Sequence, residues 1–183
     1  MNTNNQHHRA ILQNIAHRAM IERGLLPDFS REALAELDRI QAPAMQKGAP
    51  DGTQPQIHDL RNLLWASIDN DDSRDLDQLT VAEAMPSDTV KILVAIADVD
   101  TVVKNGSAID EHARHNTTSV YTAAEIFPML PEKISTDVTS LNFKEDRLAI
   151  VVEMVIGGDG AMQDSNIYRA WVRNHAKLAY NSL

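Results

Sequence analysis

The chain contains no cysteine among its 183 residues. Disulfide frameworks, thiolate metal sites and thiol nucleophiles are therefore excluded. Aromatic residues make up only 4% of the sequence, so a surface that stacks nucleic-acid bases has few side chains to draw on. The lack of cysteine agrees with a reducing compartment and predicts a cytoplasmic location.

Long hydrophobic runs are also missing. A membrane-spanning helix needs about 20 consecutive apolar residues, and the longest apolar segment, residues 92–103, is interrupted by Asp98 and Asp100. Residues 1–9 are polar and rich in histidine, without the apolar region of a secretory signal. We therefore expect neither membrane association nor an N-terminal signal.

Positive charge is scarce. The chain has 17 Lys and Arg residues against 26 Asp and Glu residues, which gives a net charge of −9. This balance argues against nucleic-acid binding through a basic surface, because phosphate contacts favour Lys and Arg. An RNA substrate would therefore require a bound divalent cation that reverses the local charge, or a basic surface supplied elsewhere.

The sequence divides into three predicted parts. Apolar residues recur at helical spacing over residues 7–24 and again over residues 30–40, where Ser30 is placed as an N-cap. These two helices would form a small helical hairpin within residues 1–41. Residues 42–56 are rich in Pro, Gly and Gln and predict a linker. Residues 57–183 then form the main domain.

The main domain is dominated by extended segments. We predict a helix over residues 107–115 and strands over residues 63–68, 79–84, 90–99, 148–156 and 163–172. The strand at 90–99 is almost entirely apolar and should lie in the middle of a sheet. Residues 157–160 read Gly-Gly-Asp-Gly and predict a hairpin turn, and residues 175–183 predict the start of a helix. The fold class is α+β, with a largely antiparallel mixed sheet and flanking helices.

An acidic run from Asp69 to Gln78 directly follows the first of these strands. Aspartate is unfavourable inside strands and helices, so the run predicts a loop at a strand end. Within nine residues it holds five aspartates, which are Asp69, Asp71, Asp72, Asp75 and Asp77. Carboxylates this close repel one another, and a hard divalent cation would relieve the repulsion.

Three interpretations of the acidic run remain open from its residues alone. It is a solvated loop, a calcium loop of EF-hand type, or a metal site for phosphoryl hydrolysis, where carboxylates hold Mg²⁺ ions that activate water. Asp69, Asp71 and Ser73 fall at the first three EF-hand ligand positions. However, Arg74 stands where that loop needs glycine, and Thr80 stands where it needs a bidentate Glu.

The acidic run resembles the signature of the ribonuclease II/R family, the RNB catalytic domain. The matching residues are Ile68-Asp69, followed by Arg74-Asp75-Leu76-Asp77-Gln78. Further segments resemble the family in the same order, at residues 94–99, 106–110, 118–121, 128–131, 140–142, 146–148 and 175–178. The likeness spans residues 57–183 and implies the N-terminal portion of an RNB-type catalytic domain, which is longer in the family than this stretch.

The resemblance implies an activity and a cofactor. Members of the family hydrolyse single-stranded RNA processively from the 3′ end with Mg²⁺, for which Mn²⁺ is an alternative, and release nucleoside monophosphates during RNA degradation. By position, Asp69, Asp75 and Asp77 match three of the four active-site aspartates. Asp69 and Asp75 would hold metal ions, and Asp77 would hold a metal ion or position the attacking water.

Two further positions follow from the resemblance. Gln78 stands where the family has its fourth aspartate, so one ligand to the metal would be a neutral amide oxygen, and Asp71 or Asp72 would supply the missing charge. Tyr121 stands where the family places an aromatic residue that stacks on RNA near its 3′ end. The alternative for Tyr121 is a half-buried tyrosine of the core.

A second function remains open. The chain would then be a catalytically incomplete fragment that binds RNA or metal, or that requires a second half of the catalytic domain, and Gln78 favours this alternative. His112 and His115, three residues apart on a predicted helix, form a potential ligand pair without a third ligand, and we expect a solvated helical face there.

Overall fold

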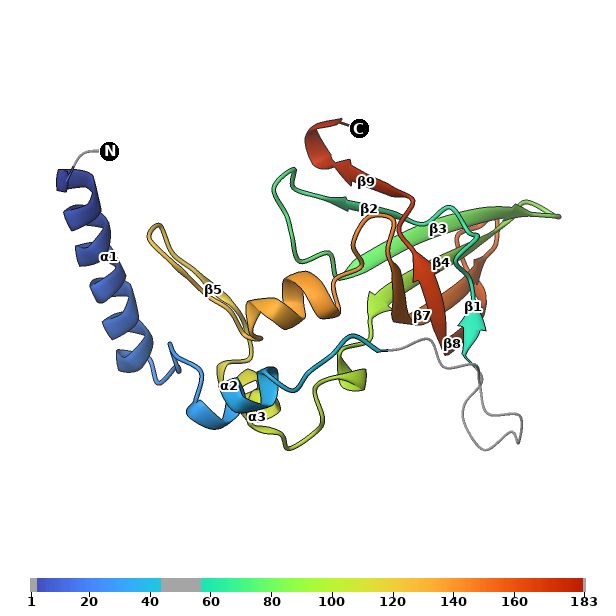
Figure 1. The fold of residues 1–183 in the computed structure, drawn as a ribbon. Helices are drawn as coiled ribbons and strands as arrows, with labels where there is room; N and C mark the ends of the chain where they lie inside the picture. The colour runs from blue at the N-terminus through green and yellow to red at the C-terminus, as the bar shows by residue number, and fades with distance from the viewer. Residues whose placement is uncertain (1–2, 44–56, 183) are drawn as a thin grey trace. The chain divides into compact units, whose positions relative to one another are not determined.

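The computed structural model describes residues 3–43 and 57–182 (Figure 1). The chain forms two compact units: residues 1–41 with 102–133, and residues 42–101 with 134–183. Apart from Ala42 and Pro43, the predicted linker lies outside the described residues. The division into an N-terminal segment, a linker and a main domain therefore stays a prediction.

The first unit is mainly helical. Its elements are α1 (Thr3–Glu22), α2 (Arg31–Leu37), α3 (Ala108–Asn116) and a small hairpin of β5 (Val120–Tyr121) and β6 (Ile126–Phe127). The predicted helices are confirmed, and so is the Ser30 cap, whose Oγ accepts a hydrogen bond from the Ala33 amide at 3.1 Å. The Glu36 carboxylate accepts hydrogen bonds from the first amides of α3, which joins α2 to α3.

His112 is buried in this unit, so the expectation of a solvated face is wrong for this residue. Its ring packs on Phe29, with 4.1 Å between the ring centroids. The Asn116 amide nitrogen lies 3.2 Å from His112 Nε2 and also donates to the Leu26 carbonyl at 2.8 Å. The segment after α1 therefore covers this side of α3.

Acid should destabilise the first unit through His112. Its burial, with a smaller effect from His115, lowers its pKa from the ordinary 6.5. The folded chain thus favours neutral His112, and this stabilisation is fully present above pH 6.5 and is lost as the pH falls through 6.5 towards the folded-state pKa. We expect the unfolding temperature to fall between pH 8 and 5, and to fall less in a His112→Gln variant. An equal fall in unfolding temperature with pH for the wild type and His112→Gln would contradict this role of His112.

The second unit is built on a seven-stranded sheet in the order β1-β8-β7-β4-β3-β2-β9. The strands are β1 (His58–Asp59), β2 (Ala66–Asp69), β3 (Gln78–Met85), β4 (Thr89–Ala97), β7 (Asp146–Ile156), β8 (Met162–Arg173) and β9 (Ala176–Ala179). Neighbours are antiparallel except for the parallel pairs β1 with β8 and β2 with β9. The predicted α+β fold with a largely antiparallel mixed sheet is confirmed.

Short helical turns complete the two units. They are η1 (Val99–Thr101), the π-helical η2 (Lys133–Val138) and η3 (Tyr180–Ser182). None of the helices in the described part of the chain combines the length and the apolar character needed to cross a membrane.

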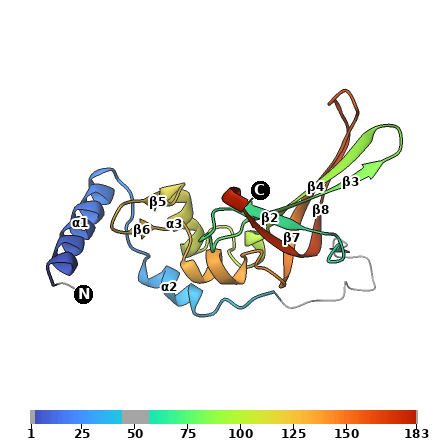
Figure 2. The ribbon, with the colours of Figure 1, turned by 90° about the horizontal axis from the view of Figure 1, so that it is seen from above.

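Most predicted strands of this unit are confirmed. β4 is the middle strand of the sheet, and β7 and β8 form a hairpin around residues 157–160. The β3–β4 and β7–β8 hairpins extend side by side (Figure 2). The predicted helix at the end of the chain is wrong, because Ala176–Ala179 forms β9 along β2. Without β9, the edge of β2 would leave backbone groups unpaired, and pairing with β9 satisfies them. Four residues are also too few to sustain a helix in isolation.

The hydrophobic core lies on one face of the sheet. It consists of Trp65, Leu79, Leu93, Ala95, Leu141, Ala149, Val151, Ala170 and Val172. Side chains alternate along a strand, so Ile96, Ile150 and Val152 point to the opposite face. That face is also apolar but open, and Ile167 on it is 67% exposed. Open apolar surfaces of this kind commonly mark interaction sites.

Candidate active site

The acidic run connects two neighbouring strands of the sheet. Asp69 ends β2, Gln78 begins β3, and the residues between them form a loop, as predicted. Leu76 is buried, while Asp75 and Asp77 on either side of it remain exposed. The buried leucine thus anchors the second half of the loop and leaves two carboxylates at the surface.

Asp69 is held by its own loop. Its Oδ1 accepts hydrogen bonds from the Asn70 amide at 2.7 Å and from the Ser73 hydroxyl at 2.9 Å. Aspartate commonly folds back on nearby backbone and hydroxyl donors in this way. Oδ1 is therefore fixed in direction at the end of β2.

Asp77 experiences the charges of the other two matched aspartates. Although the residue is accessible, protein atoms around its carboxyl group remove part of its hydration, which raises its pKa. The negative charges of Asp69 and Asp75 raise this pKa further. The three carboxylates therefore act on one another electrostatically, and a nearby cation would be attracted to them.

The run has the donor chemistry of a site for a hard cation, since carboxylate, amide and backbone oxygens are the ligands that Mg²⁺ prefers. Within residues 3–43 and 57–182, however, no three carboxylate or imidazole groups converge closely enough to form a metal site. The residue types and their charges fit a divalent cation, and its binding would require the carboxylates to move closer together.

Two sequence-distant residues support the loop, and sequence reasoning missed their role. Ser140 Oγ accepts from the Leu76 amide at 3.0 Å and lies 3.0 Å from both the Arg74 carbonyl and Asn142 Oδ1, to one of which it donates. Lys177 Nζ, on β9, donates to the carbonyls of Asp71 at 3.2 Å and Ser73 at 2.7 Å. The only signal in the sequence was that both residues lie in segments that resemble the family.

The remaining predicted residues have exposed side chains. Gln78 is exposed at the start of β3, and Asp71 and Asp72 are exposed in the loop. Tyr121 lies on β5 in the first unit, whereas the acidic run belongs to the second. Tyr121 is 68% exposed, so the alternative of a half-buried core tyrosine is wrong.

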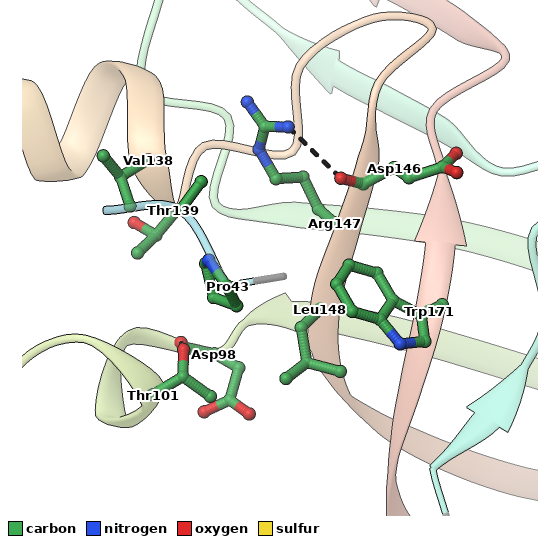
Figure 3. A pocket seen from close by; sticks show the side chains of 10 residues that line it. Pro43, Asp98, Thr101, Val138, Thr139, Asp146, Arg147, Leu148 and Trp171 are labelled. Carbon is green, nitrogen blue, oxygen red and sulfur yellow. Dashed lines mark hydrogen bonds between the residues drawn. The ribbon is translucent and has the colours of Figure 1, made fainter. Parts of the chain in front are cut away.

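A cavity elsewhere in the second unit is too small for a nucleotide. It measures about 20 Å³, room for roughly one water molecule, and Asp98, Arg147 and Trp171 are among its lining residues (Figure 3). Arg147 donates to the Asp146 carbonyl at 3.2 Å, while its buried Nε has no hydrogen-bond partner in the described part of the chain. Asp98 pairs with Arg169 at 2.8 Å. This small cavity is therefore a structural feature of the second unit.

Comparison with known proteins identifies relatives of this chain. The family model of the RNB domain matches residues 57–183. Ribonuclease R of Escherichia coli is 34% identical over 143 residues, a match that covers 78% of this chain and 18% of the relative. The chain thus corresponds to about a fifth of the length of that relative.

Solved structures share the fold. RNase R of Mycoplasma genitalium, solved in complex with ribose-methylated single-stranded RNA, aligns with a TM-score of 0.79 and 24% identity, over 88% of this chain and 24% of that one. Yeast Ssd1, described as a pseudonuclease, aligns with a TM-score of 0.59 and 13% identity, over 77% of this chain and 17% of that one. The fold therefore occurs with and without nuclease activity, and function has to be argued from the site residues.

Proposed function

Because the chain belongs to the RNB domain family, we propose that it is the N-terminal part of a catalytic domain that hydrolyses single-stranded RNA from its 3′ end. The products would be nucleoside monophosphates, as expected for RNA degradation. The observation that carries the proposal is the position of Asp69 at the end of β2 and of Asp75 and Asp77 in the loop that follows, where burial raises the pKa of Asp77 and the charges of the other two raise it further. A cytoplasmic location stays a prediction.

The proposed cofactor is Mg²⁺, with Mn²⁺ as an alternative ion. Asp69, Asp75 and Asp77 would hold it together with the amide oxygen of Gln78. Such a cation, when bound, supplies a Lewis acid that activates water and stabilises the leaving oxygen. Asp69 contributes a carboxylate whose Oδ1 is already directed by the Ser73 hydroxyl, and Asp77 contributes one whose pKa is raised by burial and, to a smaller extent, by the charges of Asp69 and Asp75.

The experiment that tests this function follows the length of a 5′-labelled single-stranded RNA incubated with the chain and Mg²⁺. A ladder that shortens from the 3′ end, and that EDTA abolishes, is the expected result. Intact RNA after incubation with folded protein would refute activity of this chain by itself. A few labelled fragments of intermediate length, without the stepwise ladder from the 3′ end, would indicate an endonuclease instead.

Tyr121 is proposed to stack on a base of the RNA. Stacking of one base on an aromatic side chain contributes about 1–3 kcal/mol, so Tyr121→Ala should weaken binding of single-stranded RNA by roughly 5- to 150-fold. Fluorescence anisotropy with labelled RNA measures this change. Tyr180→Ala is the matched control, because Tyr180 is similarly exposed at 65% and is not matched to a stacking position. Equal losses in both variants would contradict a specific role for Tyr121.

The second candidate function is that of a module that requires a further polypeptide for activity. The open apolar face of the sheet favours it, since Ile96 and Ile167 remain exposed there. The neutral Gln78 in place of a fourth aspartate agrees with it. In that case the RNA assay would give no ladder with this chain alone, and activity would appear on addition of the polypeptide that covers the face.

A further inference from the structure

We propose that Lys177 and Ser140 are positioning residues that hold the backbone of residues 71–76 and thereby fix the directions in which the acidic run presents its carboxylates. This inference rests on the proposed function of the acidic run. Neither residue carries out chemistry in it. Each acts through main-chain atoms of the loop, from an element far away in the sequence.

Ser140 fixes the second half of the loop. Its hydroxyl is buried and serves two purposes, since it accepts from the Leu76 amide and donates to the Arg74 carbonyl or to Asn142 Oδ1, each at 3.0 Å. The Leu141 amide adds a bond to the Leu76 carbonyl at 2.7 Å. Both backbone groups of Leu76 are thereby engaged. The directions of the neighbouring Asp75 and Asp77 follow from this anchored position.

The Ser140 segment is itself joined to the strand that carries Asp69. The buried Asn174 side chain donates to the Leu141 carbonyl at 3.0 Å and to the Ser67 hydroxyl at 3.1 Å. Ser67 precedes Asp69 by two residues on β2. One buried polar network therefore links both ends of the acidic run, and such networks specify geometry when their members are satisfied.

Lys177 fixes the first half of the loop. β9 runs parallel to β2 with Lys177 opposite Ser67, so the lysine lies on the strand next to the one from which the loop departs. The ammonium group binds the carbonyls of Asp71 and Ser73. It brings a positive charge to this loop through backbone oxygens, so it offsets part of the repulsion between the aspartates while the carboxylates stay available to a cation.

The test uses the full chain and begins with Lys177→Gln and Ser140→Ala. Amide hydrogen exchange, read by NMR, should accelerate about fivefold to tenfold for the hydrogen-bonded amides of residues 71–76, which are those of Ser73 and Leu76, as expected for the loss of one hydrogen bond of typical net strength. Amides of β4 and β7 should keep their wild-type exchange rates. Lys177→Arg keeps the donor to the carbonyls and Ser140→Thr keeps the hydroxyl that accepts from the Leu76 amide, so both variants should retain slow exchange. Lys144→Gln is the matched control. It also removes an ammonium group, but that group lies over the Phe143 ring, so exchange in the loop should not change.

A second measurement separates this inference from the proposed function. Binding of Mn²⁺, followed by the loss of its free-ion electron paramagnetic resonance signal, should be about fivefold to tenfold weaker in both variants. Failure of the wild-type chain to bind Mn²⁺ would count against the metal site, and the exchange data would still decide the positioning role. Unchanged exchange in residues 71–76, or acceleration spread equally over the whole sheet, would overturn the inference.

Discussion

Asp77→Asn is expected to reduce RNA degradation by about 10²- to 10⁴-fold, since metal-ion stabilisation of charge contributes several kcal/mol to catalysis and each 1.36 kcal/mol is a factor of ten in rate. The substitution preserves the shape of the side chain and removes its charge. Asp77 is exposed, and its charged form is disfavoured in the folded chain by desolvation and, to a smaller extent, by Asp69 and Asp75, so the variant should fold at least as well as the wild type. The rate of shortening of 5′-labelled RNA under saturating Mg²⁺ measures the loss.

The matched control for this prediction is Asp88→Asn. Asp88 lies in the turn between β3 and β4 and has a positive φ of 55°, a conformation that asparagine adopts as readily as aspartate. The control removes the same charge from the same unit without touching the acidic run, and it should retain wild-type activity. Equal losses in both variants would mean that net charge, and not the carboxylate of Asp77, controls the rate.

Trp65→Ala should reduce the free energy of unfolding by about 3–5 kcal/mol, the usual cost of removing a large aromatic side chain from a core. Trp65 has no exposed surface, and its Nε1 donates to the Leu60 carbonyl at 2.8 Å. A typical domain is stable by only about 5–15 kcal/mol, so the variant should unfold at a much lower urea concentration or fail to fold.

Trp65→Phe distinguishes the two contributions of the tryptophan. It keeps an aromatic ring and removes the indole donor, and we expect a loss of about 1 kcal/mol because one hydrogen bond is lost while the Leu60 carbonyl keeps its bond from the Leu63 amide at 3.2 Å. Urea denaturation followed by circular dichroism measures both variants. A Trp65→Ala variant as stable as the wild type would mean that the core assigned to this face of the sheet is wrong.

Local sequence patterns predicted most of the fold. The Ser30 cap, the apolar run that became β4 and the Gly-rich turn between β7 and β8 are all visible within a few consecutive residues. β9 was missed because its conformation depends on pairing with β2, which lies about a hundred residues earlier. His112 was misjudged for the same reason, since Phe29 comes from a distant segment of the chain.

The candidate site, too, was predicted from the sequence only in part. The acidic run was identified from its composition and its resemblance to a family, and the structure adds that the charges of Asp69 and Asp75 act on Asp77. Ser140 and Lys177 were not predicted as supports, because a serine and a lysine have no spacing that reveals a contact with a remote backbone carbonyl. The roles of Gln78 and Tyr121 stay predictions.

The separation between the acidic run and its supports has a consequence during protein synthesis. Ser140 lies 64 residues after Leu76, and Lys177 lies 104 residues after Ser73. At a translation rate of about 5–20 residues per second, the ribosome takes roughly 5–20 s to make the intervening chain. A nascent polypeptide therefore exposes its aspartates well before it can arrange them, and the geometry of the site is completed only after β9 has emerged.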